Sequence, residues 1–198
     1  MSLQTQLTAL VNAVAGDIKT IWSLMNGKAA NLDGLQTSEK SSLVAAINEV
    51  NGNAPSVVSL VKNGDLDIGT TEWKDITGWT SVIADDDFAF DDEESTITIQ
   101  ADGIYMVSFN AVLDQYAGNN RAESWCRVVV NDALLPGTAV VGYHRVLTQG
   151  ADNYSASVIV PLEANDVLRL QATDTSASHK QSVIADGTSL YVMKLRST

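Results

Sequence analysis

The sequence is poor in the residues that build disulfides and soft-metal sites. It has a single cysteine, Cys126, and two histidines, His144 and His179. One thiol cannot form a disulfide within the chain, and three such side chains are too few for a soft-metal site. No apolar run approaches the length of a transmembrane helix. The N-terminal residues lack the basic and then apolar pattern of a secretory signal, so we expect none here.

Basic residues are also scarce, because 12 Lys and Arg stand against 24 Asp and Glu, for a net charge of −12. Such a surface repels phosphate backbones and anionic lipid headgroups, so we expect no nucleic acid partner and no membrane insertion. The charge is unevenly spread: residues 1–62 sum to zero, whereas residues 65–94 hold eleven acidic side chains and one basic one. This asymmetry of charge suggests a modular protein. Apolar residues make up 45% of the chain, which is enough to form a hydrophobic core.

The first third of the chain carries apolar residues at coiled-coil spacing. Residues 27–37 are rich in Gly, Asn and Asp and predict a loop, and residues 38–50 predict a second helix. The spacing of four and three continues through Val57 and Val61, and β-branched residues at both core positions favour three strands. In the first helix, steps of four and three place six apolar residues on one face, and only Asp17 interrupts this row, which we call the first seam. The six residues are Leu3, Leu7, Leu10, Val14, Ile21 and Leu24.

Two interpretations of these helices are open. They could pack on one globular domain, or they could oligomerise or dock on another protein. Narrow seams on short segments favour the second, because a short isolated helix is marginal in water. We therefore expect a helical region at 1–52 for oligomerisation and anchoring, a neck or linker at 53–78, and a β domain at 79–198.

The last two thirds alternate with period two, which is typical of half-buried strands. One strand is predicted to bury Tyr105, Val107, Phe109, Ala111 and Leu113. Further alternating segments without helical spacers predict an antiparallel sandwich or jelly roll, with turns at 131–132, 165–166 and 186–187. The segment 189–195 is apolar on both faces, with Leu190 and Val192 on one and Tyr191, Met193 and Leu195 on the other, which suggests a subunit interface.

Two resemblances follow from these segments. Residues 17–50, and above all LVAAINEV at 43–50, resemble a short helical module found near the start of bacteriophage fibre proteins. ADGIYMVSFNAVL at 101–113, VPLEANDVLRLQA at 160–172 and SLYVMKL at 189–195 resemble the jelly roll of the tumour necrosis factor and complement-globular-head superfamily. The second resemblance implies a homotrimer with its first and last strands near the threefold axis.

Together the resemblances imply a trimeric protein on the virion surface, docked on other virion proteins of a head or tail, with the C-terminal knob facing outward. The expected fold class is therefore interrupted coiled-coil-type helices followed by an antiparallel β-sandwich, as a homotrimer. Two residue sets follow from it. The virion anchor would use Leu43, Val44, Ile47, Asn48 and Val50, and the trimer interface would use Leu7, Leu10, Val14, Ile21, Tyr191, Met193 and Leu195.

We find no motif for catalysis, since no nucleophile elbow and no glycine-rich phosphate loop occurs. We expect no enzyme and no cofactor, and we expect Cys126 to be a small buried hydrophobe. The acidic cluster could hold calcium or simply be a solvated loop, and it lacks the ladder of an EF-hand. The weak calcium candidates are Asp85, Asp86, Asp87, Asp91 and Asp92.

Aromatic side chains could form platforms for sugars, or they could fill the core or an interface. The candidates are Trp73, Trp79, Tyr116, Trp125, Tyr143 and Tyr154. We expect contact with a host glycan or protein in two polar loops, 116–124 and 173–182, through Tyr116, Asn119, Asn120, Arg121, His179 and Lys180. The leading hypothesis is a fibre or decoration protein that adheres to the host surface. The alternatives are a capsid decoration protein without receptor binding and a carbohydrate-active enzyme.

Overall fold

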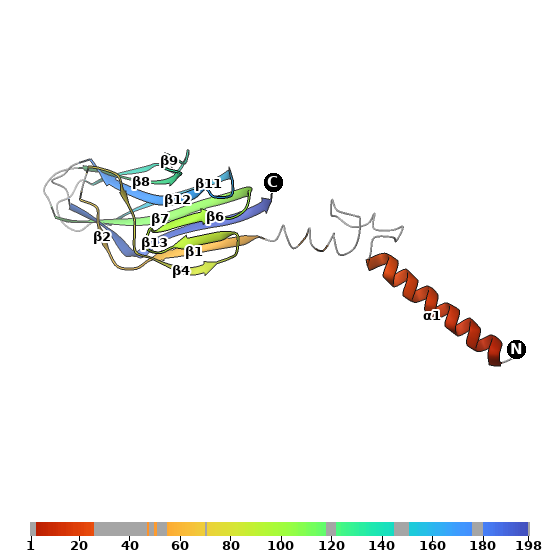
Figure 1. Cartoon of the computed structure of the whole chain (residues 1–198). Helices are drawn as coiled ribbons and strands as arrows, with labels where there is room; N and C mark the ends of the chain where they lie inside the picture. Colours follow the sequence, from red (N-terminus) through yellow and green to blue (C-terminus); the bar gives the residue numbers. More distant parts are fainter. Residues whose placement is uncertain are drawn as a thin grey trace. The chain divides into compact units, whose positions relative to one another are not determined.

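The computed structural model describes residues 3–25, 47, 50, 55–69, 71–117, 122–144, 151–175 and 180–197. The chain divides into two compact units, Met1–Ala54 and Pro55–Thr198. Figure 1 labels the helix of the first unit and strands of the second. None of the helical segments in the described ranges combines the length and the apolarity needed to cross a bilayer.

The first unit contains helix α1 (Leu3–Met25), which runs without a break through Gly16 and Asp17. Asp17 interrupts the apolar row that the sequence analysis identified, but it does not interrupt the helix. A glycine in a helix interior costs only about 1 kcal/mol relative to alanine, which the surrounding helix-forming residues offset. The Thr20 hydroxyl donates to the Gly16 carbonyl at 2.9 Å, so the helical geometry holds across this turn.

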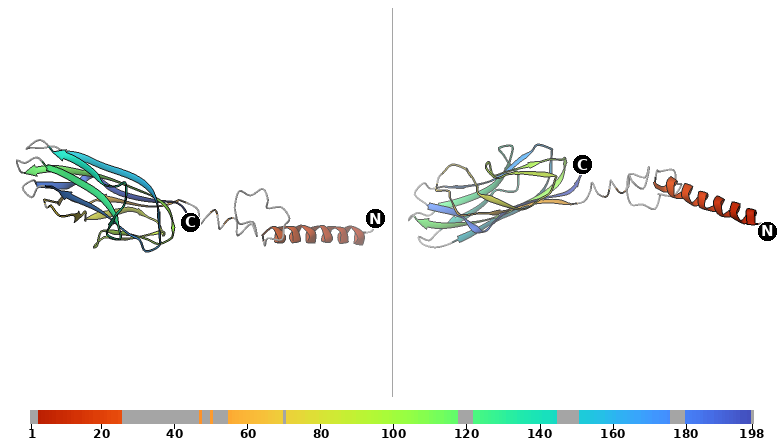
Figure 2. Two further views of the ribbon diagram at one scale, coloured as in Figure 1. Left: turned by 90° about the horizontal axis from the view of Figure 1, so that it is seen from above. Right: turned by 60° about the horizontal axis from the view of Figure 1, so that its bottom comes forward.

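The second unit is a sandwich of two antiparallel sheets, and its strands run along the length of the domain (Figure 2). In the described ranges, sheet A has the order β11-β7-β13-β1-β4, with β2 also on β13. Its strands are β1 (Ser56–Lys62), β2 (Leu66–Asp67), β4 (Trp79–Ala84), β7 (Gly103–Ala117), β11 (Ala151–Leu162) and β13 (Lys180–Ser197).

Sheet B has the order β10-β8-β12-β6-β5 in the same ranges, with β3 on β12 and β9 on β8. Its strands are β3 (Lys74–Asp75), β5 (Phe88–Asp91), β6 (Thr96–Ile99), β8 (Ala122–Val130), β9 (Ala133–Leu134), β10 (Val140–His144) and β12 (Val167–Asp174). From β6 onward the chain crosses repeatedly between the sheets, because β7, β11 and β13 lie in sheet A and β8, β10 and β12 in sheet B. This crossing connectivity is that of a jelly roll.

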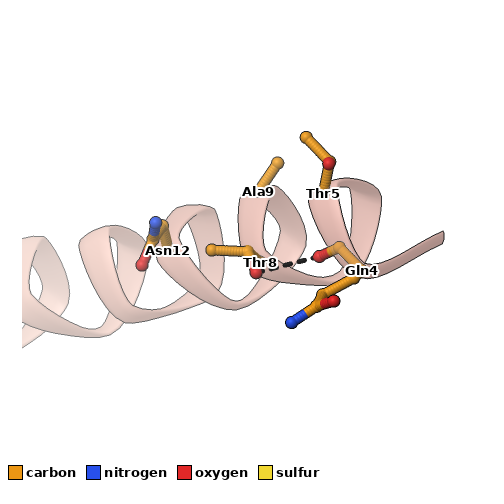
Figure 3. Close-up of a pocket in the computed structure, with 5 residues that line it drawn as sticks. All are labelled: Gln4, Thr5, Thr8, Ala9 and Asn12. Carbon is orange, nitrogen blue, oxygen red and sulfur yellow. Dashed lines mark hydrogen bonds between the residues drawn. The ribbon is translucent and has the colours of Figure 1, made fainter. Parts of the chain in front are cut away.

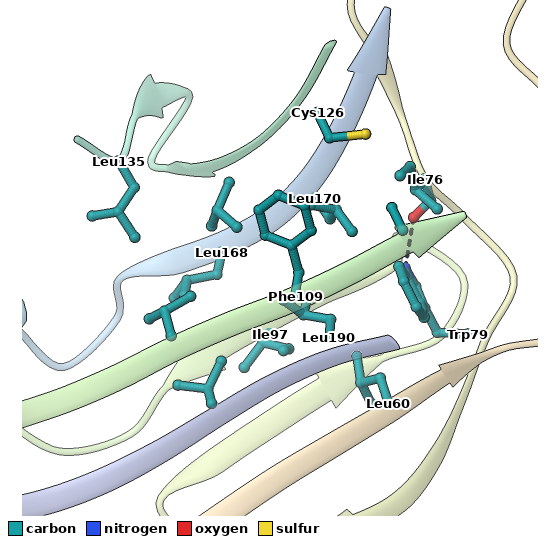
Figure 4. Packing of buried hydrophobic residues seen from close by; sticks show 14 of the residues in the cluster. Leu60, Ile76, Trp79, Ile97, Phe109, Cys126, Leu135, Leu168, Leu170 and Leu190 are labelled. Carbon is teal, nitrogen blue, oxygen red and sulfur yellow. Dashed lines mark hydrogen bonds between the residues drawn. The ribbon is translucent and has the colours of Figure 1, made fainter. Parts of the chain in front are cut away.

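The core lies between the two sheets (Figure 4). All five residues that the sequence placed on one face of β7 are buried: Tyr105, Val107, Phe109, Ala111 and Leu113. Leu190 and Val192 of β13 lie beside Phe109 and Val107 in the same sheet, and Leu168 and Leu170 of β12 are among the buried residues of the opposite sheet. The predicted alternation and the predicted sandwich are therefore confirmed.

Other boundaries differ from the prediction. The sandwich begins at Pro55, and β1, β2 and β3 occupy the stretch expected as a neck at 53–78. Val57 and Val61 lie in β1 and not on a helix, because the short apolar run pairs in register with both β13 and β4. Asp186–Gly187 is a bulge within β13 and not a turn, since β13 continues to pair with β7 on both sides of it.

The sandwich has two distinct ends. The chain enters at Ser56, which pairs with Lys194 near the end of β13, and Figure 1 shows the end of β13 close to the start of β1. At the other end of β13, Lys180 pairs with Ala117 of β7. Since β13 spans 18 residues, these two ends are roughly 50 Å apart. We call the second one the loop end, because it holds the connections from β7 to β8 and from β12 to β13.

Candidate functional site

Helix α1 has a polar side and an apolar side. Gln4, Thr5, Thr8, Ala9 and Asn12 line a shallow hollow along the polar side (Figure 3). The Thr8 hydroxyl donates to the Gln4 carbonyl at 2.9 Å, so part of this hydrogen-bonding capacity is used within the helix. Short polar side chains on one exposed helix do not enclose a ligand, and we assign no site to this hollow.

The apolar side of α1 forms a seam that, unlike the one in the sequence analysis, has no polar interruption. Leu7, Val11, Val14, Ile18 and Ile21 follow steps of four and three, and the exposed fraction of each lies between 48% and 62%. We call these five residues the α1 seam. The seam includes Leu7, Val14 and Ile21 of the predicted interface, omits the exposed Leu10, adds Val11 and Ile18, and leaves Asp17 to one side. An unbroken stripe of this kind is the surface that helices bury in a coiled coil.

The outer face of sheet A carries a second apolar surface. Ile159, Met106, Met193 and Val57 stand side by side in register across β11, β7, β13 and β1. Ile159 is 65% exposed, whereas the other three are half-buried. We call these four residues the sheet A row. A continuous apolar row on an outer sheet face marks a surface suited to a protein partner.

The predicted interface residues of β13 lie on and beside this row. Met193 belongs to it, and Tyr191 lies in the next row, opposite Ser59 of β1 and Ser108 of β7. Leu195 is 37% exposed and follows Lys194 at a register shift. β13 itself is a central strand between β7 and β1, so only its outer face is open to a partner.

Most of the predicted anchor lies outside the described residues. This holds for Leu43, Val44 and Asn48. Ile47 and Val50 are described, both in helical conformation, and they are 55% and 62% exposed. Their spacing of three places them on the same side of a helix, as the sequence predicted.

The two expected receptor loops meet at the loop end of the sandwich. The Thr175 amide donates to the Glu123 carbonyl at 2.9 Å, and the Glu123 amide donates to the Thr175 hydroxyl at 2.9 Å. β7 extends to Ala117 and β13 starts at Lys180, so the connections are shorter than predicted. Asn119, Asn120, Arg121 and His179 lie outside the described residues, as do the side chains of Tyr116, His144 and Lys180.

The candidate aromatic platforms separate into core and surface residues. Trp79 is 5% exposed and donates from its Nε1 to the Ile76 carbonyl at 2.6 Å, and Tyr154 is 1% exposed. These two belong to the core, which is one of the two roles that the sequence analysis left open for them. Trp73 is 36% exposed, Tyr143 is 48% exposed, and Trp125 is half-buried.

Trp73 and Trp125 line one open hollow of about 460 Å³ on sheet B. The register places Thr173 of β12 directly opposite Trp125 of β8, so their side chains share the outer face of the sheet. The Thr173 side chain is almost fully buried, and its Oγ1 has no hydrogen-bond partner. We call this feature the tryptophan hollow, lined by Thr71, Trp73, Trp125, Thr173, Asp174 and Thr175.

A chain of contacts fixes Trp73. The Arg127 guanidinium lies 3.7 Å from the centre of the Trp73 ring, a cation–π contact. Arg127 Nε donates to Gln171 Oε1 at 2.9 Å, and Gln171 Nε2 donates to Asp75 Oδ1 at 2.7 Å. Burial lowers the pKa of Arg127 and nearby Asp75 opposes that shift. The indole is therefore held in place by the same strands that carry the hollow.

Two members of the acidic cluster, Asp85 and Asp87, make hydrogen bonds within the fold. Asp87 accepts from the Ser56 hydroxyl at 2.5 Å and from Lys194 Nζ at 3.0 Å. Asp85 accepts from the Val57 amide at 2.8 Å. These bonds tie the β4–β5 turn to the first and last strands of the sandwich. Lys194 is only 5% exposed, so Asp87 supplies the counter-charge that its ammonium needs.

The remaining calcium candidates have no converging geometry. Asp91 accepts from the backbone amides of Glu93 and Glu94, both at 3.0 Å, which is a local turn. Asp86 and Asp92 are exposed. Within the described ranges, no three His, Cys, Asp or Glu side chains are placed to hold a metal ion.

We predict that Asp87→Asn destabilises the sandwich in a pH-dependent manner. Burial opposes ionisation of Asp87, but the bonds from Ser56 and Lys194 outweigh it and lower the pKa. A lowered folded-state pKa stabilises the fold above the unfolded-state pKa, and this contribution is lost as the pH falls through the folded-state pKa. At pH 7 we expect a loss of about 1–2 kcal/mol in the free energy of unfolding, allowing for solvent screening of this partly exposed pair.

Urea unfolding at pH 7 and near pH 3 measures this effect. The difference between wild type and Asp87→Asn should shrink at the lower pH, while Asp86→Asn, on the neighbouring exposed residue, should have little effect at either. An equal difference at both pH values would show that the Asp87 charge contributes nothing.

Cys126 is fully buried in β8, as the sequence predicted. Burial raises the pKa of its thiol well above the usual range. The thiolate is the reactive form of cysteine, so this side chain is inert in the folded protein.

Comparisons with known proteins bear on the fold alone. No family model and no curated protein matches this chain. Among solved structures, murine APRIL at pH 8.0 is similar over 71% of this chain and 99% of its own, with 13% identity and a TM-score of 0.48. Eiger TNF from S. frugiperda is similar over 73% of this chain and 94% of its own, with 14% identity and a TM-score of 0.49. The jelly-roll assignment itself stands on the strand order of this chain.

Proposed function

We propose that the chain is a homotrimeric virion structural protein, a head or tail fibre or decoration protein, that displays its sandwich for adhesion to a host surface. The α1 seam is the observation that carries the oligomeric part. Five large apolar side chains lie exposed along one side of a single helix. A stripe of exposed apolar side chains is unfavourable in water, and burial of the seam against copies of itself removes that cost and stabilises the helix.

The side chains of the seam favour three strands. Val11 and Ile18 take one of the two core positions of the heptad, and Val14 and Ile21 take the other. β-branched residues at both positions shift coiled coils away from dimers. The sheet A row gives the second unit a self-contact surface of its own, which fits a homotrimer whose subunits meet along both units.

The virion part of the proposal rests on the sequence resemblance of residues 17–50 to phage fibre modules. Ile47 and Val50 are helical and exposed, which suits a segment that docks on another protein. The two ends of the sandwich suit an outward-facing domain. The chain enters at Ser56, and the polar connections lie at the opposite end, the loop end. Three copies of a weak site on one assembly raise the effective concentration of each further contact.

Light scattering on the full chain tests the oligomeric part. We expect a mass of about three times 21.1 kDa at micromolar concentration. A mass that stays at one chain at every concentration would overturn the proposal. Electron microscopy of particles labelled with an antibody against residues 100–198 tests the location, and unlabelled particles would overturn the assignment to a virion.

A further inference from the structure

We propose that the tryptophan hollow binds a neutral hexopyranose unit of a surface glycan. The inference deepens the proposed adhesion function and rests on it, since it names the class of ligand that the displayed sandwich would hold. Trp73 and Trp125 come from segments 52 residues apart in the sequence, and the sheet brings them to one hollow.

The walls of the hollow suit a sugar ring. A hexopyranose presents C–H bonds on its faces, and these carry the partial positive charge that the face of an indole attracts. Its rim presents hydroxyls that both donate and accept hydrogen bonds. The hollow offers two indoles together with the side chains of Thr71, Thr173 and Thr175, and its open shape suits a ring that is one unit of a longer chain.

The unpaired hydroxyl of Thr173 is the strongest evidence for a ligand in this hollow. Its side chain is 7% exposed and lines the hollow, yet its Oγ1 has no hydrogen-bond partner. A buried hydroxyl left without a partner is unfavourable. A rotation about the Cα–Cβ bond would be needed to turn this hydroxyl toward the hollow, where a sugar hydroxyl can serve as its partner.

The local charges favour a neutral sugar over an acidic one. The guanidinium of Arg127 is stacked on Trp73 and bonded to Gln171, which in turn is bonded to Asp75. The whole chain carries a net charge of −12. A carboxylated or sulfated sugar would therefore meet the repulsion of a negatively charged chain, and the Arg127 guanidinium is already engaged by Trp73 and Gln171.

The hollow also lies where the displayed surface is expected. Thr175 and Glu123 exchange two hydrogen bonds beside it, which join the two connections of the loop end. This end is the one opposite the entry of the chain at Ser56. A glycan chain held in the hollow could continue over the polar surface of the loop end.

Saturation-transfer NMR with the full chain tests the proposal. The probes are the methyl pyranosides of D-glucose, D-galactose and D-mannose, and methyl N-acetyl-D-glucosaminide, each titrated through the millimolar range. We expect at least one to show saturable transfer with a Kd of about 1 mM, as is usual for a single small ring in an open site. The absence of saturable transfer from all four would overturn the proposal.

Matched variants locate the binding. Trp73→Ala should weaken binding about tenfold, and Thr173→Val, which keeps the side-chain shape, should weaken it several-fold while the unfolding temperature stays near that of wild type. Trp22→Ala removes an indole from α1 and should leave binding unchanged. Equal binding by Trp73→Ala and wild type would overturn the assignment to this hollow.

The mass of the same sample separates this inference from the proposed function. A single-chain mass with saturable binding would overturn the trimer and keep the sugar site. A threefold mass without binding would overturn the sugar site and favour a decoration protein without receptor binding.

Discussion

Phe109→Ala is expected to lower the free energy of unfolding by about 3–5 kcal/mol, because it removes a ring from the centre of the core. Phe109 is 3% exposed and lies in the middle of β7, opposite Ala156 of β11 and Leu190 of β13. Since both neighbouring strands are fixed by long ladders, we expect the cavity to stay open instead of collapsing. The midpoint of urea unfolding, followed by near-UV circular dichroism, measures the loss.

Ser108→Ala is the matched control, because Ser108 is the next residue on the same strand and faces outward, opposite Ser157 and Tyr191. Its effect should stay within about 0.5 kcal/mol. Unfolding of both variants at the same urea concentration would contradict the assignment of Phe109 to the core face of β7 and of Ser108 to its outer face.

The orientation of β7 could be predicted from the sequence because its pattern has one physical interpretation. A long alternation of apolar and polar residues can bury a face only as a strand. The same is not true of β1, where Val57, Val58, Leu60 and Val61 fit both the helical and the extended period. Their pairing with β13, which lies far along the chain, makes this segment a strand, and the local sequence pattern does not predict which strand it pairs with.

The candidate site residues also divide into those that a local sequence pattern can predict and those that depend on distant partners. Trp73 and Trp79 are six residues apart and of the same type, yet one faces solvent and the other packs in the core. The ion pair of Asp87 with Lys194 joins residues 107 positions apart, so the sequence offered only an acidic cluster. Val11 and Ile18, by contrast, could have been found, since steps of four and three from Leu7 reach both and avoid Asp17.

The double variant Ile18→Glu and Ile21→Glu is expected to reduce the light-scattering mass threefold, from about three chains to one. The two residues take the two core positions of the α1 seam and are 62% and 58% exposed in the single helix. Three copies of the variant would place six carboxylates close to one axis, where their desolvation and mutual repulsion cost far more than the lost apolar burial. Light scattering over a range of concentrations measures the change.

Thr5→Glu with Asn12→Glu adds the same two charges on the polar side shown in Figure 3, and it should keep the mass of wild type. The comparison therefore separates the position of the charges from their number. If the seam variant kept the threefold mass, α1 would not hold the trimer, and the sheet A row would be the remaining surface. Met193→Glu then becomes the decisive change, because Met193 stands in the middle of that row, between Met106 and Val57.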